Sequence, residues 1–362
     1  MVNQYLPCVL AAYSDSSFTN PHQVVLETDP PSYEGRFTHM GAEYWGVETD
    51  RHIAFSVDEQ QARFRFDPDA HHTLELELTR PSLVREVRVS TRWYTGNHVP
   101  NISVELRLPG GASKVVLDRA ALAPDQEHVF ELDEVLAHGA LVRCYHEGGI
   151  ARINLFGEPA GPPDSRLNVL ADARILRVSN DHFGHPDKAV VGVREEDYMI
   201  GWESARMGFG EHVVFELVAP VKVDELVVDT YLHRLNAPLS CHLFGLPVTA
   251  KTDGDYCSSQ MPRWTVCRDD GTAVEIDDLL AYMTERCYLD EHGVASGPLD
   301  IQLIAREASP WVSLIEFGRL YPDRLHRFQA VAPHEAVSHL LYMHFPNGGI
   351  HGLRVHAQPE NH

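Results

Sequence analysis

The chain has little positive charge and no long hydrophobic run. Its 362 residues include 30 Lys and Arg against 52 Asp and Glu, a formal net charge of −22, which argues against nucleic acid or an anionic membrane as a partner. No apolar run approaches a membrane span, and the apolar stretch in residues 1–12 lacks the basic flank and the length of a signal peptide. We therefore expect a cytoplasmic protein that acts on small molecules, since a local arginine pocket can bind an anion even in an acidic protein.

Cysteine is also scarce, and its spacing fits no common metal motif. The six cysteines form no C-x-x-C pair, although four of them lie between Cys241 and Cys287. Zinc binding there is one alternative, and reduced cysteines in a cytosolic protein are the simpler interpretation. The 22 histidines form no H-E-x-x-H pattern. We expect no metal or organic cofactor, with a divalent ion on oxygen ligands as the open alternative.

Amphipathic helical patterns are rare, whereas alternation of apolar and polar residues is frequent. Residues 74–78 alternate in this way, and so do residues 213–217. A period of two is typical of strands with one buried face, and the prolines and glycines between such segments are typical of all-β sandwiches. The exception is the segment Leu279–Cys287, where Asp277 or Asp278 could cap a helix.

The strand segments occur twice along the chain. Residues 74–97 align with residues 213–236 without a gap at an offset of 139, and Asp125 aligns with Asp323 at an offset of 198. The second copy therefore carries an insertion of 59 residues, the difference between these offsets. A repeat of this size is typical of a duplicated domain rather than of a solenoid unit.

Domain limits follow from the repeat and from one Pro- and Gly-rich stretch. We predict two β-sandwich domains at residues 14–158 and 175–358, joined by a linker at 159–174. The insertion occupies about residues 245–309 of the second domain, and a segment this long usually has a function or a structure of its own.

Four motifs in a fixed order carry a family resemblance. They are G-W-E-S-A-R at residues 201–206, D-T followed by N-A-P within 229–238, P-D-x-x-H at 322–326 and G-G-I-A-R at 148–152. Together they resemble the allantoicase family from about residue 14 to residue 355, apart from the insertion. The resemblance implies two tandem jelly-roll, galactose-binding-like domains and a homo-oligomeric enzyme of purine breakdown. It also implies that allantoate, an anionic ureide, is converted to ureidoglycolate and urea.

The sequence departs from the family pattern at several motif positions. Asp50 and Ala205 stand where the family has the first arginine after the glutamate, and Val47 stands where a tryptophan is expected. Three functions are therefore considered. The first is allantoicase itself, and the second is a diverged enzyme for another ureido, amidine or amide substrate in a specialised biosynthetic pathway. The third is a non-catalytic ligand-binding protein.

Cleavage of allantoate sets chemical requirements for the site. The departing nitrogen needs a proton, and a base must activate water or take a proton from the remaining ureido N–H so that an imine forms. A guanidinium suits the substrate carboxylate, and carboxylates or asparagines suit the ureido groups.

Residues of these types within the repeated motifs are the candidates. The candidate catalytic residues are Glu48, Glu203, His128, His326 and His233, and the candidate substrate-binding residues are Arg51, Arg152, Arg206, Asn97, Asn236 and Trp202. Each has a structural alternative: ion pairs for the glutamates and arginines, turn hydrogen bonds for the asparagines and the P-D-x-x-H histidines, and core packing for Trp202. Arg152 is the preferred arginine because only one copy has it, and an asymmetric substrate does not need a duplicated ligand.

Overall fold

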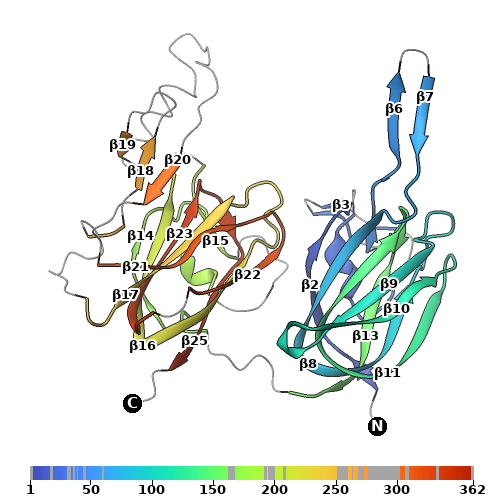
Figure 1. Cartoon of the computed structure of the whole chain (residues 1–362), viewed down its shortest axis with the longest axis horizontal. Helices are drawn as coiled ribbons and strands as arrows, with labels where there is room; N and C mark the ends of the chain where they lie inside the picture. The colour runs from blue at the N-terminus through green and yellow to red at the C-terminus, as the bar shows by residue number, and fades with distance from the viewer. Residues whose placement is uncertain are drawn as a thin grey trace. The chain divides into compact units, whose positions relative to one another are not determined.

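The chain consists of two compact units, residues Met1–Ser165 and Arg166–His362, which divide inside the predicted linker. The predicted helix Leu279–Cys287 lies outside the residues that the structure describes. The computed structural model (Figure 1) describes residues 3–16, 19–30, 34–35, 37–38, 40–43, 46–58, 61–161, 168–190, 194, 200–206, 209–250, 260–262, 264–267, 273–275, 302–305, 310–331 and 334–359.

The first unit is a sandwich of antiparallel strands in which two long, bent strands contribute to both layers. Strands β8 and β11 pair from one end to the other, from Glu127 opposite Ser90 to Tyr145 opposite His71. The first half of β8 also pairs with β2, its second half pairs with β13, and β9 and β10 extend the sheet beyond β11. The elements are β1 (Gln4–Tyr5), β2 (Cys8–Tyr13), η1 (Pro21–Val25), β3 (Phe37–Thr38), β4 (Gly41–Ala42), β5 (Val47–Glu48), β6 (Ala54–Asp58), β7 (Gln61–Arg65), β8 (His71–Ser90), β9 (Asn101–Arg107), η2 (Pro109–Gly111), β10 (Ser113–Ala121), β11 (Glu127–Tyr145), β12 (Gly149–Ile150) and β13 (Arg152–Pro159).

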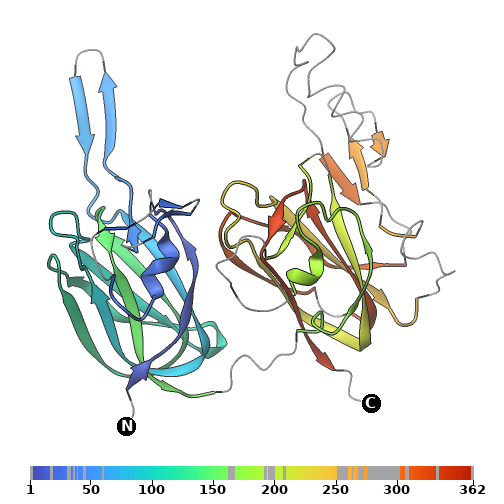
Figure 2. The ribbon, with the colours of Figure 1, turned by 180° about the vertical axis from the view of Figure 1, so that it is seen from behind.

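The second unit repeats this arrangement. Strand β16 pairs with β14 and β23 along its first half and with β22 and β25 along its second half, so it corresponds to β8. Figure 2 shows that each unit also carries a short helical turn, η1 in the first and η3 in the second. The elements are β14 (Arg174–Val178), η3 (Pro186–Lys188), β15 (Trp202–Glu203), β16 (Glu211–Asp229), β17 (Ser240–Pro247), β18 (Trp264–Cys267), β19 (Ala273–Glu275), β20 (Gln302–Ala305), β21 (Val312–Arg319), β22 (Leu325–Gln329), β23 (Val337–Phe345), β24 (Gly349–Ile350) and β25 (Gly352–Pro359).

The cores confirm the predicted all-β fold of two repeated jelly-roll sandwiches. Leu74, Leu76 and Leu78 of β8 are buried, and Val213 and Phe215 are their counterparts in β16. The alternate residues of both strands are more exposed, as the period of two requires. Burial of each such side chain contributes about 1.5–3 kcal/mol, so these repeated strands account for much of the stability of each unit.

Two features extend beyond the shared sandwich. Strands β6 and β7 form a hairpin that projects from the first unit (Figure 1), and Phe55, Val57 and Phe64 on it are more than half exposed. In the second unit, β18, β19 and β20 form a small three-stranded sheet within the predicted insertion. Within the described part of the chain, no helix is long and apolar enough to cross a membrane.

Candidate active site

A short strand pair in the first unit holds one candidate glutamate against one candidate asparagine. Glu48 of β5 pairs in register with Gly149 of β12. Asn97 donates from Nδ2 to Oε1 of Glu48 over 2.9 Å, and its backbone oxygen accepts the N–H of Gly149 over 2.7 Å. Position 149 has to be glycine, since a Cβ there would lie 1.9 Å from the ring of Tyr94. Close backbone approach therefore fixes the Glu48 carboxylate next to Asn97.

The second unit has the same frame. Asn236 donates from Nδ2 to Oε1 of Glu203 over 2.6 Å, and its backbone oxygen accepts the N–H of Gly349 over 2.9 Å. The ring of His233 takes the place of the Tyr94 ring, 2.2 Å from where a Cβ on Gly349 would lie. The predicted Glu–Asn pairs thus come together in both copies.

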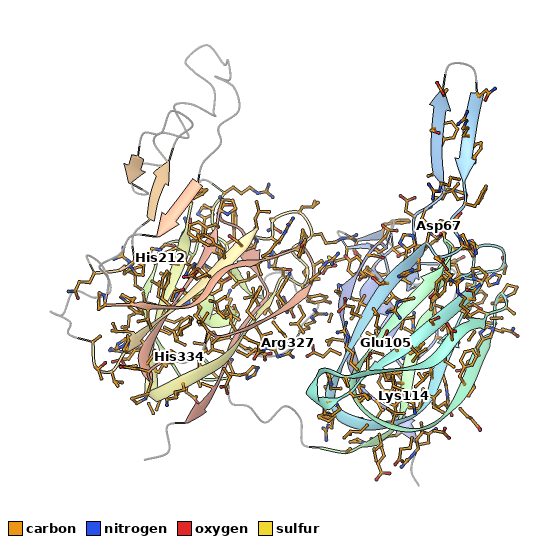
Figure 3. All side chains as sticks on the ribbon, viewed as in Figure 1. Asp67, Glu105, Lys114, His212, Arg327 and His334 are labelled. Atoms are coloured by element: carbon orange, nitrogen blue, oxygen red, sulfur yellow. The ribbon has the colours of Figure 1, made fainter. Side chains whose placement is uncertain are left out.

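A pocket of about 550 Å³ opens beside the frame of the first unit. Asp67, which Figure 3 labels at the foot of the β6–β7 hairpin, is part of its wall. Oε2 of Glu48 is buried and has no hydrogen-bond partner among the described residues. The polar residues that the argument below uses are Glu48, Arg51, His52, Asn97, His98 and Glu147.

Arg51 is the one predicted arginine that lines this pocket. Its Nη1 lies 3.6 Å from Oε1 of Glu147, and 79% of its side chain is exposed. Oε2 of the same Glu147 lies 3.9 Å from Nε2 of His52. The loop after β5 therefore places a mobile cation and an imidazole on either side of one carboxylate.

Arg152, the arginine preferred from the sequence, does not line the pocket. Only 4% of the residue is exposed, and its guanidinium donates to the backbone oxygens of Thr28 (2.6 Å) and Ala151 (2.5 Å). Burial lowers the pKa of Arg152 to about 10, with Asp29 acting in the opposite direction. This geometry favours the structural alternative for Arg152.

The two P-D-x-x-H histidines have identical surroundings. The N–H of Ala123 donates to Nε2 of His128 (2.8 Å), whose Nδ1 faces the oxygen of Val89 (3.2 Å). The N–H of Tyr321 and the oxygen of Val228 contact His326 in the same way, at 2.9 and 3.2 Å. Backbone groups thus occupy both ring nitrogens of each histidine, which favours the turn-fixing alternative over proton transfer.

The remaining candidates of the second unit differ in exposure. Trp202 is fully buried, donates from Nε1 to the oxygen of Asn180 and packs on the ring of His344, as the core alternative predicts. His233 is buried beside Asn236, and burial lowers its pKa despite the nearby Glu203 carboxylate. Arg206 is exposed, and its backbone oxygen accepts from Asn347.

Sequence reasoning missed two residues of the pocket, His52 and Glu147. Both lie outside the family motifs, and the signal was available in the repeat. The aligned sequence positions in the second copy are Met207 and Asn347, so these two groups belong to one copy only. Among the described residues, no group of three or more His, Cys, Asp or Glu is arranged to hold a metal ion.

The fold and the site define the class of this protein as a tandem pair of β-sandwich domains with a repeated Glu–Asn frame. The allantoicase repeat model matches residues 1–160 and 167–360. The chain therefore belongs to the allantoicase family, as the motifs predicted.

Individual relatives agree with this assignment at low identity. The chain is 25% identical to an allantoicase of Neurospora crassa over 96% of this chain and 87% of the relative. It is 28% identical to a probable allantoicase of Schizosaccharomyces pombe over 62% of this chain and 68% of the relative. Allantoicase from Saccharomyces cerevisiae has a crystal structure that matches 97% of this chain and 90% of that chain, with 19% identity and a TM-score of 0.34.

Proposed function

We propose that the protein hydrolyses a C–N bond of allantoate, releasing ureidoglycolate and urea, in the pocket of the first unit. Membership of the allantoicase family supports the reaction class. The observation that carries the location is the Glu48 carboxylate, which Asn97 holds at the wall of a pocket that Arg51 also lines.

The pocket groups match the parts of this substrate. The guanidinium of Arg51 is free to swing toward a carboxylate, because most of its side chain is exposed and its contact with Glu147 is long. Glu48 accepts ureido N–H groups through Oε2, the oxygen that has no partner in the described structure. Asn97 keeps Oε1 occupied, so the carboxylate presents one defined oxygen to the substrate.

The test is release of urea from allantoate by the purified protein, compared with the Glu48→Gln and Glu203→Gln variants. Hydrogen bonds to a charged group contribute about 1.5–3 kcal/mol, so we expect Glu48→Gln to lower kcat/KM roughly 10- to 150-fold. Glu203→Gln is the matched control, since Glu203 has the same frame in the second unit, and we expect it to stay within about threefold. No urea from the wild type contradicts the reaction, and equal losses in both variants contradict the location.

The charge of the pocket supports a second candidate function, hydrolysis of an amidine-bearing carboxylate. Glu48, Asp50, Asp67 and Glu147 all line the pocket, against Arg51 as its one arginine. Such an acidic wall favours a substrate that carries a cation as well as a carboxylate. Guanidinoacetate tests this idea: hydrolysis would give glycine and urea, and a higher kcat/KM than for allantoate would favour the second candidate.

Assembly and location are proposed on separate observations. The exposed apolar face of the β6–β7 hairpin, with Phe55, Val57 and Phe64, supports a homo-oligomer, since an isolated hairpin is at best marginally stable in water. Light scattering of the wild type and of a Phe55→Ser, Phe64→Ser double variant tests this proposal, and two monomers would contradict it. The free thiols of Cys8 and Cys144 support a reducing compartment such as the cytoplasm, which fractionation of cells would test.

A further inference from the structure

The pocket contains an imidazole whose surroundings suit proton transfer. His52 lines the pocket in the segment that also supplies Glu48 and Arg51. Its side chain is 16% exposed, and both of its ring nitrogens are buried without a hydrogen-bond partner among the described residues. Buried polar atoms are nearly always paired in folded proteins, so a bound molecule is the natural partner for this ring.

Glu147 gives the ring a defined orientation. Its Oε2 lies 3.9 Å from Nε2 of His52, and hydrogen bonds of this kind commonly shorten when substrate binds. An Nε2–H directed at Glu147 leaves the lone pair of Nδ1 for the substrate and stabilises the imidazolium that proton uptake creates. Glu147 also contacts Arg51, so substrate binding and proton transfer share one carboxylate.

Other histidines keep this ring in the form that a base requires. Burial lowers the pKa of His52, and His72, His146 and His71 lower it further, while Glu147 acts to raise it. The ring of His72 lies 5.2 Å from that of His52, and the ring of His146 stacks on it at 6.1 Å. The imidazole is therefore neutral at pH 7 and able to accept a proton.

We infer that His52 is the proton-transfer residue of the proposed reaction, with Glu147 as its positioning residue; the inference rests on the proposed function. Nδ1 takes the proton of the retained ureido N–H, and the electrons of that bond form a C=N bond. The C–N bond to the other ureido group breaks, and the imidazolium gives its proton to the departing nitrogen, which releases urea. Water then adds across the C=N bond, with hydroxyl to carbon and a proton to nitrogen, giving ureidoglycolate.

The repeat places this chemistry in one unit only. The Glu–Asn frame is present in both copies, but Met207 and Asn347 align with His52 and Glu147, and neither offers an imidazole or a carboxylate. The frame by itself thus fits binding, whereas proton transfer needs the pair that the first copy alone carries.

The experiment compares urea release by the wild type, His52→Gln and Glu147→Gln across pH 5–9, with His182→Gln as the control at an exposed histidine of the second unit. We expect His52→Gln to lose about 10²- to 10⁴-fold in kcat at an unchanged Tm. Wild-type kcat/KM should fall as the pH drops through the pKa of His52, because a protonated ring cannot accept a proton. This limb should be absent in His52→Gln and should move to lower pH in Glu147→Gln, which lacks the carboxylate that raises the pKa. Added imidazole should restore activity about tenfold in His52→Gly.

Each result has a definite meaning. A His52→Gln variant within about threefold of the wild type overturns the inference and leaves the proposed function standing. A large loss with an unchanged acid limb and no rescue by imidazole also overturns it, since that pattern indicates a structural role. A wild type that releases no urea removes the proposed function and the inference together.

Discussion

Two arginines with equal standing in the sequence have opposite surroundings in the structure. Arg152 is buried and bonded to backbone oxygens, whereas Arg51 lines the pocket with most of its side chain exposed. Replacement of Arg152 by Met leaves the oxygens of Thr28 and Ala151 without donors, so we expect a loss of about 2–4 kcal/mol in the free energy of unfolding. Chemical denaturation measures this loss, and KM of the folded protein should stay within about twofold.

Arg51→Met is the matched variant. An exposed ion pair contributes about 0–1 kcal/mol, so the free energy of unfolding should hardly change. The substrate carboxylate loses its bidentate partner, so we expect KM to rise at least tenfold, or about 1.4 kcal/mol. The opposite pattern, with a high KM in Arg152→Met and a normal KM in Arg51→Met, would restore the assignment made from the sequence.

The P-D-x-x-H histidines give a second prediction at this scale. His128→Phe keeps an aromatic ring beside Phe130 but loses the contacts with Ala123 and Val89, so we expect a loss of about 1–3 kcal/mol in stability. Urea release per folded molecule should be unchanged. A kcat reduced more than 100-fold at normal stability would show that the ring transfers protons after all.

Sequence could predict which residues meet in the site only where both copies keep them. The Glu48–Asn97 and Glu203–Asn236 pairs are repeated at fixed spacing, so the frame was predictable. Burial cannot be read from a motif, which is why Arg152 seemed the better clamp. His52 lies outside every family motif, and its role depends on contacts with residues about 95 positions away, such as Glu147.

At the scale of elements, period-two alternation predicted strands but not their lengths. Segment 74–78 is part of β8, a strand of 20 residues that continues through Pro81. The register with β11 shifts between Glu131 and Val135 and again between Ala137 and Gly139, which lets one strand serve both layers. Long-range pairing of this kind leaves no local signal. The β6–β7 hairpin was not predicted, because its exposed face carries phenylalanines that look like core residues.

Close backbone approach at β12 leads to a prediction for the whole strand pair. A Cβ at position 149 would overlap the ring of Tyr94, whereas a Cβ at Gly96 meets nothing within 4 Å. We expect Gly149→Ala to lower the free energy of unfolding by about 3 kcal/mol and to reduce activity, since β12 positions Glu48. Gly96→Ala should be neutral or slightly stabilising. Equal stabilities of the two variants in thermal denaturation would contradict this account.

For the whole molecule, duplication produced two similar frames and two different chemical environments. The pocket of the first unit gathers His52, Glu147 and Arg51 around its frame. The second unit has Gly352 opposite Asp229 in register, where the first has Arg152 opposite Ser90, and Arg194 from another segment pairs with Asp229 instead. The copies thus keep the same strand order while their polar interiors are built from different residues.

Buried histidines should make the second unit the acid-sensitive one. Burial lowers the pKa of His344 to about 3 and those of His242 and His351 to about 4, and all three lie in the second unit. In the first unit only His52, among its described histidines, has a pKa clearly lowered by burial. The unfolded chain binds protons at these histidines near pH 6.5 while the folded unit does not, so stability is lost as the pH falls from 6.5 toward 4.

The size of this effect can be measured. At pH 5 each of the three histidines costs the second unit about 2 kcal/mol, together about 6 kcal/mol of a typical 5–15 kcal/mol. Glu211 of the same unit, whose pKa burial raises, acts in the opposite direction as a single group. Calorimetry at pH 8 and pH 5 should show one transition falling by roughly 12–24 °C, and proteolysis with mass spectrometry should assign it to residues 166–362. His344→Phe should remove about a third of the shift, and equal shifts of both transitions would contradict the assignment.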